Sequence, residues 1–419
     1  MGTVVLVGTL DTKGREYRFM RDCLREAGAD VLLMDVGILR DPEICPDIGA
    51  SEVAAAAGVN LLELRFSKEG SDTRAVALDT MRRGAAIIFG QMLAQGRCQG
   101  VLGAAGSGGS TVIAGIMHEL PLGFPKLLVT TMAASAAAFF GTRDLTLMHS
   151  VTDIAGLNRV SRLILRNAAH AIAGMVTAPA IDEDGRKPVV AITMFGVTTP
   201  GVLRLQERLD RSGFDTITFH AVGSGGRAME QMIDEKLIDG VIDYTTSELT
   251  DELLGGLFGA GPTRLTAAGR QGIPQVVVPG AIEVLNFGPR DSVPAEFDTP
   301  DRRLVVHNPY VCAVRTSKRE AIELARIMSE RLGMATGPTA VVLPLEGFDS
   351  YQKRPDGPFI DEEADKAFCD ELCRTLRADI PCEQLPLNIN DPAFADHVAD
   401  IFTGLWPAAA HGRAERDDA

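Results

Sequence analysis

A glycine-rich turn, GAAGSGGST at residues 103–111, carries the clearest chemical signal in the chain. The phosphate-loop pattern is G-x-x-x-x-G-K-[ST], and Gly103, Gly108 and Ser110 occupy three of its four fixed positions, whereas Gly109 stands where the lysine belongs. An apolar stretch precedes the turn and a helical pattern follows it. Because a helix N-terminus offers free N–H groups and partial positive charge, the turn predicts an anion site, with a tight packing turn as the alternative.

A second turn, GTLDTKG at residues 8–14, could supply the missing lysine. It follows the first apolar run, and loops at the C-terminal ends of neighbouring parallel strands converge on one crevice. We expect Lys13 to neutralise phosphate charge there, and Thr9, Asp11 and Thr12 to hold a ribose or a hydrated Mg²⁺. A solvated turn in which Asp11 merely caps a helix is an equal alternative.

Two further segments would complete this crevice. TTMAAS, residues 130–135, follows another strand and offers hydroxyl groups, although such clusters often only cap helices. Asp35 ends the second apolar run, where doubly wound folds often place a ribose-binding acid, but GTLDTKG lacks the glycine pattern of an NAD site. The predicted cofactor is ATP with Mg²⁺ on Ser110 or Thr111, and the predicted cofactor-binding residues are Gly8, Thr9, Asp11, Thr12, Lys13, Asp35, Gly106, Ser107, Gly108, Gly109, Ser110, Thr111, Thr131 and Met132.

The second half of the chain offers hydroxyl, carboxylate and imidazole groups where the first half has glycines. The stretch DYTTSELTDE, from residue 243, predicts recognition of a polar second substrate, and the predicted substrate-binding residues are Asp243, Thr245, Glu248, Asn286 and Arg315. His220, His307 and Glu346 are candidates for acid–base catalysis, although a histidine alone is more often structural. We predict no metal centre from the scattered cysteines.

The elements that must position these residues follow an alternating pattern of strand and helix. The first 37 residues form a β-α-β pattern, which recurs 185 residues later without a gap: Val4, Val5, Leu24, Gly28 and Asp30 match Val189, Val190, Leu209, Gly213 and Asp215. We predict an α/β fold of two Rossmann-like lobes with mainly parallel sheets. Internal duplication and the common demands of β-α-β units explain the repeat equally well.

Composition shifts along the chain predict its domains. We expect an N-terminal nucleotide-binding lobe at 1–181, a C-terminal lobe at 182–406 and a disordered tail at 407–419, with the substrate in the cleft between lobes. Residues 38–75 should form an inserted helical flap or dimer arm. Residues 151–176 should form an uninterrupted helix that passes from one lobe to the other.

Charge and composition narrow the expected partners. A net charge of -15 and an aromatic content of 5% argue against nucleic acid or an anionic membrane as the main partner. The N-terminus does not resemble a secretory signal, and no apolar stretch reaches the ~18 residues of a membrane helix. Seven scattered cysteines fit a reducing compartment, so we expect a cytoplasmic protein with a small-molecule substrate.

Several motifs, in this order along nearly the whole chain, resemble a known family: GTLDTKGREYRFMRDCLREAGADVLLMDVG, GAAGSGGST, TTMAAS, PGAIEVLNFG, DGPFIDEEAD and INDPAFAD. They are similar to the ATP-binding domain family of the tomato mosaic virus resistance protein. The resemblance implies ATP binding, two α/β lobes and a homodimer. Because the plant protein continues into a TIM-barrel domain, it also implies a separately encoded TIM-barrel partner. Asn388 replaces the histidine common in relatives, so no proton-transfer role is carried over there.

Two functions follow from these observations. The first is an ATP-dependent enzyme, or the ATP-binding component of one, that acts on a small polar metabolite. The alternative is a regulatory or protein-interaction module that binds ATP without hydrolysing it.

Overall fold

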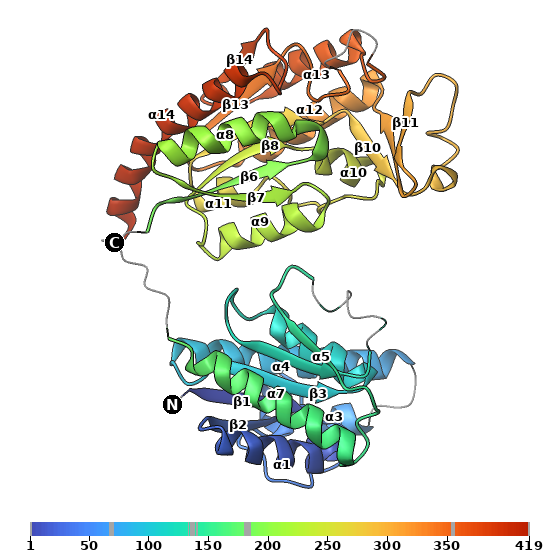
Figure 1. Ribbon diagram of the computed structural model, residues 1–419, viewed down its shortest axis with the longest axis vertical. Coiled ribbons are helices and arrows are strands. Elements are labelled where there is room, and N and C mark those ends of the chain that lie inside the picture. The colour runs from blue at the N-terminus through green and yellow to red at the C-terminus, as the bar shows by residue number, and fades with distance from the viewer. Residues whose placement is uncertain are drawn as a thin grey trace. The chain divides into compact units, whose positions relative to one another are not determined.

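The computed structural model describes residues 2–66, 71–132, 134, 139, 141–179, 186–352 and 357–417. It divides into an N-terminal unit, Met1–Asp182, and a C-terminal unit, Glu183–Ala419, within one residue of the boundary predicted from the sequence. Each unit is built on a parallel β-sheet with helices on both faces (Figure 1). The predicted α/β fold of two Rossmann-like lobes is therefore confirmed.

The N-terminal sheet has five parallel strands in the order β2-β1-β3-β4-β5. Its strands are β1 (Thr3–Gly8), β2 (Asp30–Asp35), β3 (Gly100–Ala105), β4 (Lys126–Thr130) and β5 (Thr146–His149). The strands β3 and β4 are buried along their whole length, since helices cover both faces. Strand order reverses between β1 and β3, so the C-terminal ends of these strands form the topological switch point where such sheets bind ligands.

Two helical layers enclose this sheet. The helices α1 (Leu10–Glu26) and α7 (Arg159–Thr177) pack on one face, and α2 (Ala50–Ala56), α3 (Leu61–Phe66), α4 (Ser71–Ala94) and α5 (Ser107–His118) pack on the other. The helical insertion expected at 38–75 contains α2, α3 and the start of α4.

The expected helix at 151–176 was placed too early. The α7 helix begins at Arg159 because Asn158 caps it, accepting hydrogen bonds from the amides of Val160 and Ser161 at 2.8 and 2.9 Å. Its apolar face packs within the core of the N-terminal unit rather than leaving that unit.

The C-terminal sheet has six parallel strands in the order β14-β13-β9-β8-β6-β7. The strands are β6 (Val189–Met194), β7 (Asp215–His220), β8 (Gly240–Thr245), β9 (Gln275–Gly280), β13 (Thr339–Pro344) and β14 (Cys382–Leu385). The helices are α8 (Thr199–Arg211), α9 (Ser224–Asp234), α10 (Glu248–Leu254), α11 (Ala267–Gln271), α12 (Lys318–Gly333), α13 (Glu362–Thr375) and α14 (Pro392–Asp417). The first four strands of each unit share one spatial order, as the sequence repeat predicted.

An antiparallel insertion distinguishes the C-terminal unit. The strands β10 (Val284–Phe287), β11 (Leu304–Asn308) and β12 (Val311–Arg315) pair in the order β10-β12-β11 between β9 and α12. The sequence analysis did not predict this small sheet.

The last helix, α14, has the bounds Pro392–Asp417 and so overlaps the predicted tail at 407–419; the disorder expected there stays a prediction. Residues 418 and 419 of the predicted tail lie outside the described residues. Among the described helices, none combines the length and the apolar character that a membrane span requires.

Candidate functional site

The glycine-rich turn connects the C-terminal end of β3 to the N-terminus of α5. Gly106 precedes the helix, and within the described part of the chain no side chain caps the first N–H groups at Ser107, Gly108 and Gly109. Thr131, after β4, lies beside this turn, because its Oγ1 is 3.9 Å from the position of a Cβ on Gly106. The helix N-terminus is therefore available to an anion at the switch point of the sheet.

Arg74 on α4 is a cation that the sequence analysis missed. Its Nη2 lies 3.5 Å from the position that a Cβ would occupy on Gly108. The guanidinium therefore lies near the place of the absent phosphate-loop lysine, and sequence spacing gave no signal because Arg74 belongs to a different helix. Gly109 has a packing role instead, since its Cβ would lie 2.7 Å from that of Ala105.

Lys13 has a protein partner in this structure. Its Nζ donates a hydrogen bond to the carbonyl of Ile154, in the loop after β5. The α1 helix starts at Leu10 and is kinked at Lys13, which has φ -128° and ψ 24°. The hydroxyls of Thr9 and Thr12 lie 3.0 Å apart, at the exposed side of the same turn. Lys13 would have to leave Ile154 in order to bind a phosphate.

Gly8 is required by packing. A Cβ at Gly8 would lie 1.9 Å from the hydroxyl of Tyr17. That hydroxyl donates to the carbonyl of Val7 at 2.7 Å and accepts from the amide of Ala104 at 2.9 Å, so it joins β1 to β3 beneath the glycine-rich turn. Burial raises the pKa of Tyr17, which keeps the hydroxyl protonated. This contact explains Gly8 without a cofactor.

Asp35 and Asp11 brace the loops that follow β1 and β2. Asp35 accepts hydrogen bonds from the amides of Leu10 and Gly37 at 3.0 and 2.8 Å, and Asp11 accepts one from Leu39 at 2.9 Å. Burial raises the pKa of Asp35 to about 6 despite these hydrogen bonds. Among the described residues, the second oxygen of each buried carboxyl, Asp11 Oδ1 and Asp35 Oδ2, has no hydrogen-bond partner. Both of these oxygens are buried, so neither is open to a ligand in this structure.

The hydroxyls after the glycines differ in access. Ser110 is fully buried, and its Oγ lies 2.8 Å from Thr130 Oγ1 and 3.2 Å from the carbonyl of Ala105. The amide of Met132 also donates to Thr130 Oγ1, at 3.1 Å. Thr111 is exposed. Of the two predicted Mg²⁺ ligands, Thr111 is thus the accessible one, and Ser110 connects β3 to β4.

Two predicted substrate-binding residues of the C-terminal unit form a buried ionic network. Arg264 has no solvent exposure and donates to both Asp243 and Glu248, at 2.7 Å from each. The second oxygen of Glu248 accepts from the amides of Gly223 and Gly226 at 2.7 and 3.1 Å. The protein's own carboxylate therefore occupies the glycine-rich turn before α9, and these contacts assign Asp243 and Glu248 to the structure of the unit.

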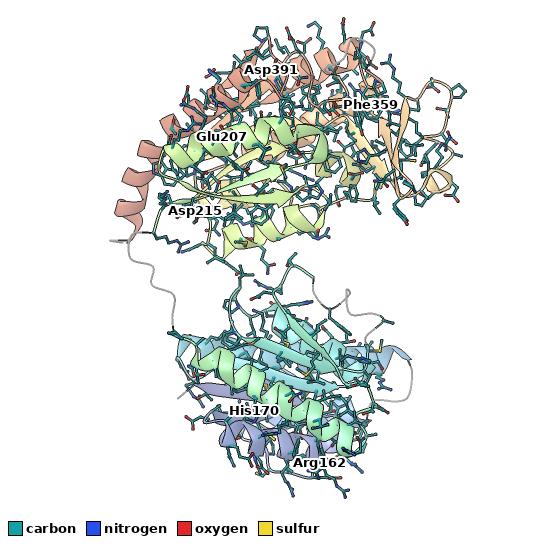
Figure 2. All side chains as sticks on the ribbon, viewed as in Figure 1. Arg162, His170, Glu207, Asp215, Phe359 and Asp391 are labelled. Atoms are coloured by element: carbon teal, nitrogen blue, oxygen red, sulfur yellow. The ribbon has the colours of Figure 1, made fainter. Side chains whose placement is uncertain are left out.

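Thr245 and Arg315 are also engaged inside the C-terminal unit. The hydroxyl of Thr245 lies 2.8 Å from that of Thr198, and neither is exposed. Arg315 is 3% exposed, forms an ion pair with Asp365 and donates to the carbonyl of Phe359 at 3.0 Å. Figure 2 labels Phe359 beside the antiparallel insertion. Both predicted residues therefore stabilise the fold.

A cavity of about 190 Å³ contains the remaining predicted groups. His220, His307 and Asn286 line it, where the loops after β6 and β7 meet the antiparallel strands. Glu346, the third predicted acid–base residue, is exposed and lines a separate cavity of about 760 Å³ beside α13. The structure therefore brings the two histidines into one cavity and separates them from Glu346.

Hydrogen bonds orient both imidazoles. His220 Nδ1 lies 3.1 Å from the carbonyl of Met194, which can only accept, so Nδ1 carries the proton and Nε2 is an acceptor when the ring is neutral. The ring of His220 stacks on Phe195 with centroids 5.6 Å apart. His307 Nδ1 lies 2.9 Å from the hydroxyl of Tyr351.

Asn286 is fixed by a buried carboxyl group. Its amide nitrogen and its Nδ2 donate to the two oxygens of Asp251 at 2.7 and 2.8 Å. Burial raises the pKa of Asp251 to about 7, although the hydrogen bonds from Asn286 lower it. Among the described residues, no three or more His, Cys, Asp or Glu side chains are grouped to hold a metal ion.

A second buried acid pair lies at the ends of β9 and β13. Burial raises the pKa of Glu283 well above its usual value, and the charge of Asp349 raises it further. Burial also raises the pKa of Asp349 to about 7, and among the described residues Asp349 Oδ2 and both carboxyl oxygens of Glu283 have no hydrogen-bond partner. Two such groups cannot both ionise without a large cost.

The segment with Asn388 connects three loops. Its Nδ2 donates to the carbonyls of Glu346 and Asp349 at 3.0 and 3.2 Å, and its amide donates to Asp391 at 3.0 Å. Asn388 therefore has a structural role in the C-terminal unit.

Two models of one protein family together match most of the chain. The N-terminal domain of an uncharacterised protein family, UPF0261, matches residues 2–180, and its C-terminal domain matches residues 187–406. A UPF0261 protein of Clostridium tetani is 39% identical over 394 residues, covering 94% of this chain and 96% of that protein. One of Mesorhizobium japonicum is 40% identical, covering 95% of this chain and 98% of that protein. The ToMV resistance protein Tm-1(GCR237) of Solanum lycopersicum is 33% identical, covering 97% of this chain and 56% of that protein. The chain therefore belongs to the UPF0261 family and contains both of its domains.

Proposed function

We propose that the protein binds ATP with Mg²⁺ in its N-terminal unit and uses it on a small polar metabolite. The observation that carries this proposal is the open N-terminus of α5 at the switch point of the sheet, with the Arg74 guanidinium beside Gly108. Backbone amides at a helix N-terminus and a guanidinium group are both strong donors to phosphate oxygens.

The other groups at this end of the sheet suit the remaining parts of the nucleotide. The exposed side chain of Thr111 would supply a hydroxyl for Mg²⁺. Lys13 would add a second cation after leaving the Ile154 carbonyl. The order of motifs shared with the ATP-binding domain family supports ATP over other phosphates.

A second candidate function is an ATP-binding module that recognises a protein and does not hydrolyse ATP. Exposed apolar side chains in and around the helical insertion of the N-terminal unit favour it: Leu39, Leu62, Phe66, Val76 and Ile87. The same surface would serve a homodimer. A separately encoded TIM-barrel protein is a further candidate partner.

The test is a calorimetric titration of the full chain with Mg²⁺-ATP, followed by assay of the same sample for ADP. Saturable binding with slow ADP formation supports the enzyme, and binding without ADP supports the module. Absence of binding would remove both, since each requires the nucleotide.

A further inference from the structure

We propose that the cavity lined by His220, His307 and Asn286 binds a small, flat ring compound that bears N–H or O–H donors. This inference concerns the C-terminal unit alone and does not depend on the nucleotide site. Its volume of about 190 Å³ is below the ~300 Å³ at which sites for drug-sized ligands begin, so a single substituted ring is the appropriate size.

The walls of the cavity favour a flat ligand. The ring of Phe195 stacks on His220, and Phe258 meets Phe195 edge-on with centroids 6.2 Å apart. Tyr351, from the segment after β13, also lines the cavity. Aromatic faces and edges hold another planar ring by offset stacking and by edge contacts, which a saturated ring makes poorly.

Asn286 supplies a fixed acceptor. The residue is 1% exposed, and the ionised carboxylate of Asp251 receives Nδ2, because a carboxylate can only accept. The Oδ1 atom therefore points away from Asp251, and no hydrogen bond to it occurs within the described part of the chain. The fold leaves room for this buried acid, because a Cβ on Gly256 would lie 1.8 Å from Asp251 Oδ1. Burying the Asp251 carboxyl costs free energy, and a ligand that donates to the side-chain oxygen of Asn286 would offset part of that cost.

His220 supplies a second acceptor. The Met194 carbonyl fixes the proton on Nδ1, which leaves the lone pair of Nε2 available when the ring is neutral. Two acceptors, Asn286 Oδ1 and His220 Nε2, select a ligand that donates hydrogen bonds. A primary amide on a flat ring provides both features.

The experiment is a titration of the full-length protein with benzamide as the probe, in which binding is measured by ligand-observed NMR. Cyclohexanecarboxamide keeps the amide and loses the flat ring, whereas benzoate keeps the ring and loses the donors. We expect benzamide to bind at least about ten times more tightly than either comparator. Equal affinity for all three compounds, or no binding of benzamide, would overturn the proposal.

Two substitutions locate the site. Gly196 lines the cavity, and a Cβ there would have no atom within 4 Å, so Gly196→Leu should fold and obstruct the cavity. Gly333→Leu, at the end of α12, is the control because its Cβ also meets nothing within 4 Å. We expect a loss of at least tenfold in benzamide affinity for Gly196→Leu alone. Unchanged affinity in Gly196→Leu would show that the compound binds elsewhere.

A third substitution tests the acceptor. His220→Phe keeps a ring against Phe195 and removes Nε2, so benzamide affinity should fall while benzoate affinity does not. Parallel loss of both would contradict the donor selectivity. Mg²⁺-ATP titration of the same variants distinguishes a failure here from a failure of the nucleotide site, because these substitutions lie in the C-terminal unit.

Discussion

The hydroxyl of Tyr17 accepts a hydrogen bond from the amide of Ala104 at 2.9 Å, and this contact connects α1 to the end of β3. The same hydroxyl donates to the carbonyl of Val7 on β1 at 2.7 Å. The paired register of β1 and β3 extends to Leu6 and Leu102, so the tyrosine bridges the strands just beyond that register. The Tyr17 hydroxyl therefore supports the end of β3, from which the glycine-rich turn begins.

We predict that Tyr17→Phe destabilises the N-terminal unit by about 1–3 kcal/mol, because it leaves a buried amide and a buried carbonyl without their partner. Hydrogen exchange at the amide of Ala104 should rise most. The measurement is urea unfolding together with exchange of the 100–106 segment. Tyr310→Phe is the control, since Tyr310 is 77% exposed. Unchanged exchange at Ala104 would contradict the bridging role.

We predict that Glu248→Gln destabilises the C-terminal unit by about 1–3 kcal/mol, because an amide has one acceptor oxygen and its NH₂ group would face a donor, either Arg264 Nε or the amides of Gly223 and Gly226. Arg264 would keep Asp243 but lose the carboxylate at its Nε. Thermal unfolding measures the effect. Binding of benzamide by the folded variant at low temperature should persist, and its specific loss without destabilisation would restore Glu248 as a ligand-binding residue.

The raised pKa of Asp349 predicts that the stability of the C-terminal unit depends on pH. Its pKa is raised to about 7 in the fold by burial, above the value of an exposed aspartate. The folded state therefore favours the protonated form of Asp349. The contribution of Asp349 to the free energy of unfolding is full below about pH 4 and is lost as pH rises through 7. Asp349→Asn keeps an acceptor for the amide of Gln352, so it should raise Tm at pH 8 by several degrees and reduce the change in Tm between pH 5 and 8.

The control for this pH prediction is Asp215→Asn, which changes an exposed carboxyl group on β7 (Figure 2). It should leave both Tm and its pH dependence unchanged. A parent protein whose Tm rises steadily from pH 5 to 8 would contradict the inferred sign.

The sequence predicted the strands and the glycine turns because their signals are local. Buried apolar runs and the helical periods after them depend on neighbours along the chain, as in β3 and α5. The partners of charged side chains are not local: Arg264, which contacts Asp243 and Glu248, and Arg74 beside Gly108 are brought in by packing of distant segments. Candidate binding residues and structural acids therefore looked alike in the sequence.

The two glycines at the start of α5 should respond differently to valine. Gly109→Val should impair folding, because a Cβ at Gly109 overlaps that of Ala105. Gly108→Val should fold, since its Cβ meets no atom closer than 3.5 Å, and should lose at least about tenfold in Mg²⁺-ATP affinity by covering the helix N-terminus. Gly174→Val on α7 is the matched control, with no atom within 4 Å of its Cβ. Normal ATP affinity in Gly108→Val would mean that the turn serves packing alone.

The most direct measurement is the dissociation constant of Mg²⁺-ATP for Arg74→Ala compared with the parent protein, determined by calorimetry. Arg83→Ala on the same helix is the control, because Arg83 pairs with Asp79 at the surface. The account predicts saturable binding by the parent and by Arg83→Ala, and an affinity at least about tenfold weaker for Arg74→Ala. Equal binding by all three proteins, or no binding by the parent, would contradict a phosphate site at the N-terminus of α5.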